Sequence, residues 1–227
     1  MSIVRTLATA ALSIAAMVVV LNQCRRPRWW PGRLLLSIMN VRHAAVTGWG
    51  LGHVAIERSF TILDVGCGGG KTIQRLAAVA DGGKVFGVDY SATSVAAARH
   101  LNSAAIAAGR VDVQQASVSR LPFPDDTFDL VSAVETHYYW PEPVHDMREI
   151  LRVLKPGGRL VIIAETHRGE TFDALITIPM KLLRARYLTV REHRELFTAA
   201  GFADVAIYER RTGWICGVAQ KPSAMAA

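Results

Sequence analysis

Cysteine is scarce in this chain of 227 residues, which contains only Cys24, Cys67 and Cys216. The three positions are too scattered for a disulfide framework or for a cysteine-based metal site. We therefore expect a reducing compartment and no metal centre. Cys67 lies within a glycine-rich turn, and we interpret it as a small packing residue rather than as a nucleophile.

Charged residues are almost absent from the first 23 positions, where Arg5 is the only one. The uncharged run at residues 7–21 is shorter than the roughly 20 residues that span a bilayer, but an extension to residues 2–23 reaches that length. Tryptophans and arginines follow, as expected at a cytoplasmic membrane edge. We therefore predict a single-pass membrane anchor with a basic juxtamembrane segment at residues 1–32. The alternative is a hydrophobic helix that packs on a soluble cytoplasmic domain. A cleaved signal peptide is disfavoured, because no Ala-x-Ala cleavage site follows the apolar run.

Acidic residues are outnumbered, with 19 Asp and Glu against 26 Lys and Arg, which gives a formal net charge of +7. Part of the excess is the arginine cluster that follows the apolar run. Attraction to anionic lipid accounts for this cluster, and no aromatic–basic nucleic-acid motif accompanies it. Nucleic acid is therefore not expected as a partner.

Two glycines that other nucleotide-binding loops require are missing from the turn at residues 62–70, Ile-Leu-Asp-Val-Gly-Cys-Gly-Gly-Gly. A P-loop needs glycine where the chain has Val65, and a dinucleotide fingerprint needs its third glycine where the chain has Lys71. A P-loop is therefore excluded, and binding of a dinucleotide such as NAD is less favoured but remains an alternative. Glycines let the main chain approach a ligand closely, at the carboxyl end of the strand predicted over residues 61–65.

Three further segments follow in order. The strand at residues 84–89 ends in Asp89, which suits a ribose diol, although capping of the next helix (residues 91–108) is the alternative. Residues 121–131 read Leu-Pro-Phe-Pro-Asp-x-x-Phe-Asp-Leu-Val, and residues 151–162 form a helix–turn–strand element around Pro156.

Together with the glycine turn, these segments resemble the motifs of class I S-adenosylmethionine-dependent methyltransferases, of the type 11-like domain. The resemblance implies an α/β, Rossmann-like doubly wound sheet of seven strands, mostly parallel with an antiparallel edge strand, behind an N-terminal hydrophobic helix. We expect the domain to occupy residues 33–220, with a disordered tail at 221–227. The helix of residues 189–200 would be its last.

The resemblance also implies S-adenosylmethionine as the cofactor. Many family members carry an acid before the Leu-Pro-Phe run, where it contacts adenine; here Ser117 and the main chain of Val118 take that place. The full set of residues expected to bind the cofactor is Asp64, Gly66, Cys67, Gly68, Asp89, Tyr90, Ser117, Val118, Glu135, Trp49 and Gly50.

The methyl acceptor is expected next to residues 134–142, which follow the fourth strand and combine acidic, basic and aromatic side chains. Methyl transfer mainly requires alignment, and a base is needed only when the acceptor loses a proton. We predict His137 as that base, with Glu135 and Tyr138 as further catalytic residues; packing is the alternative for the aromatic side chains. His43 and His53, near the start of the domain, are interpreted as capping or core residues.

We expect a small-molecule or lipid-like acceptor, partly covered by the insert at residues 170–187. Two other functions stay open. One is a membrane-tethered module that binds S-adenosylmethionine without turnover, and the other is an NAD-linked oxidoreductase. The sequence does not identify the acceptor molecule or atom.

Overall fold

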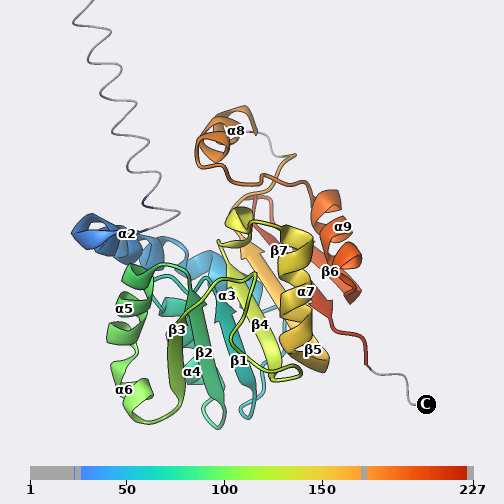
Figure 1. The fold of residues 1–227 in the computed structure, drawn as a ribbon. Helices are drawn as coiled ribbons and strands as arrows, with labels where there is room; N and C mark the ends of the chain where they lie inside the picture. Colours follow the sequence, from blue (N-terminus) through green and yellow to red (C-terminus); the bar gives the residue numbers. More distant parts are fainter. Residues whose placement is uncertain (1–22, 24–26, 170–172, 224–227) are drawn as a thin grey trace, which may run out of the picture.

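The computed structural model describes residues 23, 27–169 and 173–223. Within this part of the chain, seven strands form one sheet in the order β3-β2-β1-β4-β5-β7-β6 (Figure 1). β1 to β5 are mutually parallel, and β7 is antiparallel to both of its neighbours. The predicted fold class is therefore confirmed. The strands are β1 Thr61–Val65, β2 Lys84–Asp89, β3 Val111–Gln115, β4 Phe128–Val134, β5 Leu154–Ala164, β6 Ala203–Glu209 and β7 Ile215–Gln220.

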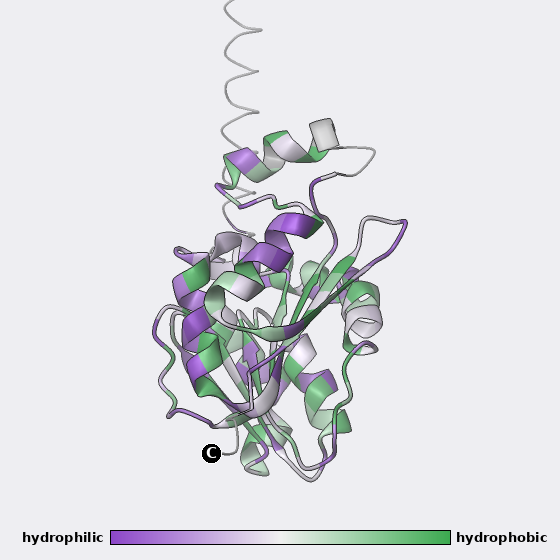
Figure 2. Ribbon diagram, turned by 90° about the vertical axis from the view of Figure 1, so that its right-hand side faces the viewer, coloured by the Kyte–Doolittle hydropathy of each residue, from purple (hydrophilic) through white to green (hydrophobic). Residues whose placement is uncertain are grey.

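Helices cover both faces of this sheet. α3, α4 and α5 pack on one face, and α7 and α9 pack on the other. Figure 2 shows the helices striped in hydrophilic and hydrophobic colours around strands that are mostly hydrophobic. The described helices are α2 Trp29–Arg42, α3 Ala44–Leu51, α4 Lys71–Val79, α5 Ala92–Leu101, α6 Ser103–Ala107, η1 His137–Tyr139, α7 Pro143–Val153, α8 Asp173–Leu182 and α9 Val190–Ala200.

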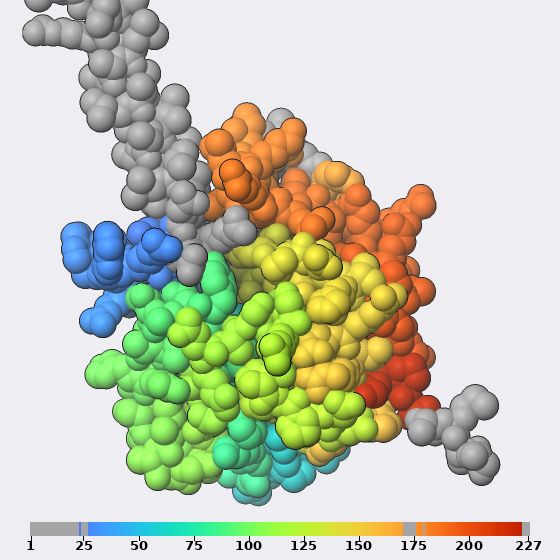
Figure 3. All heavy atoms as spheres, viewed as in Figure 1, coloured from blue at the N-terminus to red at the C-terminus, as the bar shows by residue number. Residues whose placement is uncertain are grey.

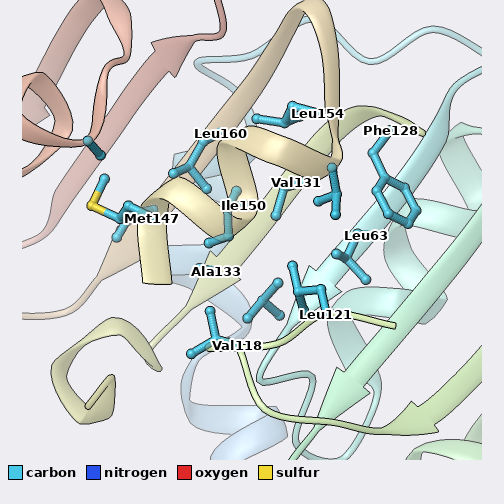
Figure 4. Close-up of a cluster of buried hydrophobic side chains, with 14 of the residues drawn as sticks. Leu63, Val118, Leu121, Phe128, Val131, Ala133, Met147, Ile150, Leu154 and Leu160 are labelled. Atoms are coloured by element: carbon cyan, nitrogen blue, oxygen red, sulfur yellow. The ribbon is translucent and has the colours of Figure 1, made fainter. Parts of the chain in front are cut away.

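Strand periodicity divides the core into two clusters. Successive strand residues point to opposite faces, so Ile62 joins the cluster under α3 to α5 whereas Leu63 joins the cluster under α7 and α9. Leu130 and Val131 of β4 divide in the same way. Figure 4 shows the second cluster, in which side chains of β1, β4 and α7 meet. Because both faces are buried, the strands read as nearly continuous apolar runs.

The helix predicted over residues 91–108 is divided into α5 and α6 at Asn102. The buried Asn102 amide donates to the carbonyl oxygens of Ala98, at 2.9 Å, and Gly70, at 3.0 Å. The side chain thus ties the end of α5 to the glycine turn. The helix predicted over residues 189–200 agrees more closely with the structure, where α9 has nearly the same bounds. Thr189 and Glu192 form a reciprocal capping box at its start.

β1 and β4 lie side by side in the middle of the sheet, and the strands that follow them in the chain lie on opposite sides. β2 is the outer neighbour of β1, and β5 is the outer neighbour of β4. In such sheets the crevice at the carboxyl ends of the strands is the usual ligand site. Helices α2 and α3 precede β1 and lie over this end (Figure 1). The fold thus places the turn after β1, the end of β2 and the segment after β4 beside one another.

The prediction of a transmembrane helix is corrected by the structure. Across residues 23, 27–169 and 173–223, no helix combines the length and apolar character needed to cross a bilayer. The apolar run at residues 7–21 lies outside the described residues. At the other end of the chain, Lys221 is the first residue of the predicted tail at residues 221–227. Its backbone N–H donates to Gly158 O at 2.8 Å, and its ammonium group contacts Asp126.

Candidate active site

The turn after β1 is shaped by glycines in the left-handed region. Gly66, Gly68 and Gly70 have φ of 72°, 51° and 80°. A Cβ at Gly66 would lie 2.1 Å from Oγ1 of Thr136, a distance that no side chain tolerates. The Gly66 N–H donates to Val88 O at 2.8 Å, which fixes the turn against β2. The main chain is therefore exposed to a ligand on a rigid support.

Asp89 lies beside this turn at the end of β2. Its Oδ2 accepts from the Gly68 N–H at 3.0 Å, and its Oδ1 accepts from the Ser91 N–H at 2.8 Å. The residue is 8% exposed, and burial raises the pKa of its carboxyl group. The Ser94 side chain also bonds this carboxylate, and a carboxylate has about four lone-pair sites, so capacity remains to accept from a ribose hydroxyl. The alternative role of helix cap belongs to Ser91, whose Oγ accepts from the Ser94 N–H.

Two connected cavities form a cleft over these residues. An inner cavity of about 100 Å³ and an outer cavity of about 870 Å³ share five lining residues: Gly66, Asp89, Tyr90, Thr136 and Tyr139. Asp64 and Glu135 line the inner cavity, and Ser117 and Val118 line the outer one. Figure 3 shows the surfaces of α2 and of the α8 segment on the same upper face of the molecule.

Two buried acids give the inner cavity its electrostatic character. Burial raises the pKa of Asp64 to about 7, although Ser132 Oγ donates to Asp64 Oδ1 at 2.7 Å. Burial and the nearby Glu165 raise the pKa of Glu135 to about 8. Glu135 accepts from the Tyr138 hydroxyl at 3.0 Å and from the Glu165 backbone N–H. Neither acid forms an ion pair with another described residue, so the cavity favours a cationic ligand.

The cleft gathers most of the residues predicted to bind the cofactor but not Trp49 or Gly50. A Cβ at Gly50 would lie 2.5 Å from Cγ1 of Ile163, so this glycine faces the sheet. The Trp49 ring packs against Trp214, with centroids 5.9 Å apart. Helix α3 instead lines the cleft with Ala44 and Thr47, which lie on its other face. The predicted residues that line the cleft are Asp64, Gly66, Cys67, Gly68, Asp89, Tyr90, Ser117, Val118 and Glu135.

His137 does not line the cleft. It is 4% exposed, and its Nε2 lies 3.0 Å from Nε2 of His193. His193 donates from Nδ1 to Thr189 O at 2.8 Å, so its Nε2 accepts and His137 Nε2 donates. Burial lowers the pKa of His137 well below its usual value. The structure therefore does not place this imidazole where the predicted base would have to act.

Tyr138 is also buried, and it reaches the cleft only through its hydrogen bond to Glu135. Sequence reasoning missed other lining residues, above all Asn40 and His43, which the α2–α3 segment carries over the inner cavity. The available signal was the cluster of polar residues at positions 39–43. Cys67 lines the cavity, but burial raises the pKa of its thiol well above the usual value, which fits a packing role.

Comparison with known proteins places this cleft in context. Residues 63–162 match the model of a family described as "Methyltransferase domain". Over 123 residues the chain is 39% identical to methyltransferase GfsG of Streptomyces halstedii, covering 54% of this chain and 44% of the relative. It is 35% identical over 111 residues to the 27-O-demethylrifamycin SV methyltransferase of Amycolatopsis mediterranei, covering 49% and 40%. The chain thus spans less than half the length of these curated relatives.

A solved structure supports the same fold. The S-adenosylmethionine-dependent methyltransferase of Aquifex aeolicus superposes with a TM-score of 0.68 over 83% of this chain and 97% of that chain. The two sequences are 22% identical, so this likeness concerns the fold alone.

Proposed function

We propose that this chain, which belongs to the class I S-adenosylmethionine-dependent methyltransferases, transfers a methyl group to a small-molecule acceptor. The family membership confirms the predicted cofactor. The observation that carries the proposal is the convergence, in one cleft, of the glycine turn, the Asp89 carboxylate and the unpaired acids Asp64 and Glu135. S-adenosylmethionine supplies an activated methyl group on a positively charged sulfur.

The residues present fit this cofactor. Asp89 has free lone pairs for the ribose hydroxyls, and the turn presents backbone at Gly66 and Gly68 without side chains in the way. Asp64 and Glu135 lie where the ammonium and sulfonium groups would bind, and a bound cation would favour the charged form of both acids. All five of these residues line the inner cavity, so one bound cofactor could contact them together.

The outer cavity suits a small, mostly apolar acceptor. Trp29, Tyr139, Trp140 and Pro141 contribute to its lining, together with the predicted adenine contacts Ser117 and Val118. Its volume of about 870 Å³ lies in the range of small-molecule pockets. Aromatic walls exclude water and orient a flat or branched apolar molecule. The Amycolatopsis relative is a methyltransferase of 27-O-demethylrifamycin SV, a small molecule, which supports the same class of acceptor here.

The alternative functions are not favoured. An NAD-linked oxidoreductase would need a third glycine at position 71, where α4 begins with Lys71. A module without turnover would not need space for an acceptor, and the outer cavity is wide enough to offer such space, which supports turnover.

Isothermal titration with S-adenosylhomocysteine tests the cofactor site. We expect Asp89→Ala to weaken binding by at least about tenfold, because the ribose hydroxyls lose charge-assisted hydrogen bonds. Asp204→Asn is the matched control, since Asp204 is exposed on β6. A folded wild-type protein that does not bind the ligand contradicts the proposal. Transfer of a tritiated methyl group into a cell extract then tests turnover.

A further inference from the structure

His43 occupies a position over the inner cavity that no sequence signal assigned to chemistry. It lies between α2 and α3, its side chain is 17% exposed, and it lines the cavity together with Glu135 and Tyr139. Its backbone is held in the helical junction, because its N–H donates to Met39 O at 2.9 Å and its carbonyl accepts from the Thr47 hydroxyl at 2.7 Å. The imidazole is thus presented to the cleft from a fixed support.

A carboxylate faces this imidazole. Nε2 of His43 lies 3.9 Å from Oε2 of Glu165, the residue that follows β5. Arg42 holds the same oxygen from the other side, with Nη2 at 3.1 Å and Nε at 3.2 Å. The Glu165 backbone N–H is bound to Glu135, which anchors the peptide as well. At 3.9 Å the two atoms form no direct hydrogen bond, but the nearby carboxylate stabilises the protonated form of the imidazole, which arises when the ring accepts a proton.

Burial is the main reason why this histidine favours its neutral form. Burial lowers the pKa of His43, the carboxylate of Glu165 raises it, and the guanidinium of Arg42 lowers it. A neutral imidazole beside the cleft can accept a proton at neutral pH. Other titratable or charged groups that line the same cavity are Asp64, Cys67, Lys71, Arg75, Asp89, Tyr90, Glu135 and Tyr139.

We propose that His43 is the base of the reaction, that Glu165 is its positioning residue, and that the acceptor atom is a hydroxyl oxygen. The inference rests on the proposed function and deepens it. The hydroxyl proton passes to the unprotonated ring nitrogen of His43, an oxygen lone pair forms the bond to the methyl carbon, and the electron pair of the broken carbon–sulfur bond remains on sulfur. A neutral amine attacks with its own lone pair and needs no base in that step, so the dyad favours a hydroxyl group.

The activity test uses tritiated S-adenosylmethionine with three probe acceptors: decylhydroquinone, farnesol and dodecylamine. We expect methyl ethers of a hydroxyl probe, and we expect His43→Gln to lower kcat by on the order of 100-fold or more. The wild-type kcat should fall with acidity below about pH 6.5, the ordinary pKa of histidine, and His43→Gln should lose this limb. His100→Gln, on the exposed face of α5, is the matched control.

A second readout does not depend on turnover. The pKa of His43, followed by its ring proton signals in the complex with S-adenosylhomocysteine, should fall further in Glu165→Gln because the carboxylate that raises it is gone. The affinity of His43→Gln for S-adenosylhomocysteine is measured as well, so that a fall in kcat is assigned to the chemical step only where the cofactor still binds.

Four outcomes decide the matter. Labelled methyl ether together with the lost acid limb supports the inference. N-methylated dodecylamine as the main product, or a His43→Gln enzyme with wild-type kcat and pH profile, overturns it while leaving the proposed function intact. A pKa of His43 that does not respond to Glu165→Gln overturns the positioning role. No labelled product from a protein that binds the cofactor overturns both proposals.

Discussion

Replacement of Glu135 by glutamine should make the protein more stable and at the same time weaken its cofactor site. Burial and the nearby Glu165 raise the pKa of the Glu135 carboxyl group to about 8, from an ordinary value of 4.5. Between these values the folded protein retains a proton that the unfolded chain has released. The free energy of unfolding therefore falls as the pH rises from about 4.5 to about 8.

The magnitude follows from the same pKa values. At 1.36 kcal/mol for each pKa unit, a rise from 4.5 to about 8 is equivalent to at most about 5 kcal/mol. Glu135 borders the cleft and keeps some contact with water, so we expect about 2 kcal/mol in practice. For a chain of this size that corresponds to a rise of about 4–8 °C in Tm at pH 8.5. Glutamine fits the site, because its amide oxygen can still accept from the Glu165 N–H.

Thermal unfolding at pH 5.5 and at pH 8.5 measures this effect. We expect the Tm of Glu135→Gln to exceed that of the wild type at pH 8.5 and to approach it at pH 5.5, where the wild-type carboxyl group is protonated. Glu57→Gln, at an exposed position, is the control. Titration with S-adenosylhomocysteine should show weaker binding by Glu135→Gln. A variant that is less stable than the wild type at pH 8.5 would refute the reasoning.

Three further predictions concern other parts of the site. Gly66→Ala should abolish binding of S-adenosylhomocysteine, because its Cβ would clash with Thr136; retained affinity in calorimetry would contradict this. The buried pair of His137 and His193 should make the protein acid-sensitive: both pKa values are lowered by burial, so stability is lost as the pH falls below about 6.5. Urea unfolding from pH 7.5 to 5.0 should show a smaller loss in His193→Phe than in the wild type. Asn102→Ala should cost about 1–3 kcal/mol in urea unfolding, since it removes the two hydrogen bonds that tie α5 to the glycine turn; an unchanged midpoint would argue against that tie.

Local patterns predicted the donor side of the cleft well. The strand, the turn at Gly66 to Gly70 and the acid at Asp89 all lie within 30 positions, and each requirement is set by backbone geometry at its own position. Parallel pairing of β1 with β2 then brings Asp89 to the turn, as the alternation of strands and helices predicts. The division of the predicted helix at Asn102 was not readable, because the amide finds its partner at Gly70, which is distant in sequence.

The acceptor side was predicted less well, and the histidines show why. His137 follows β4 at the expected end of the sheet, but the 3₁₀ turn η1 directs it under α9, where it meets His193. His43 has no motif around it and becomes notable only because α2 and α3 lie over the cavity, next to Glu165. Trp49 and Thr47 lie on opposite faces of α3, and only packing decides which face borders the cleft.

The sequence by itself determined the fold class, the glycine turn and the resemblance to methyltransferases, because these depend on strand periodicity, on positive φ angles and on motifs that are short and contiguous. Only the tertiary structure decided which side chains border the cleft. Glu135, His43 and Glu165 come from three separate segments. Burial and the charge of Glu165 shift the pKa values of Glu135 and His43. Burial and distance between remote segments are properties of the packed molecule, so no single segment of the sequence contains them.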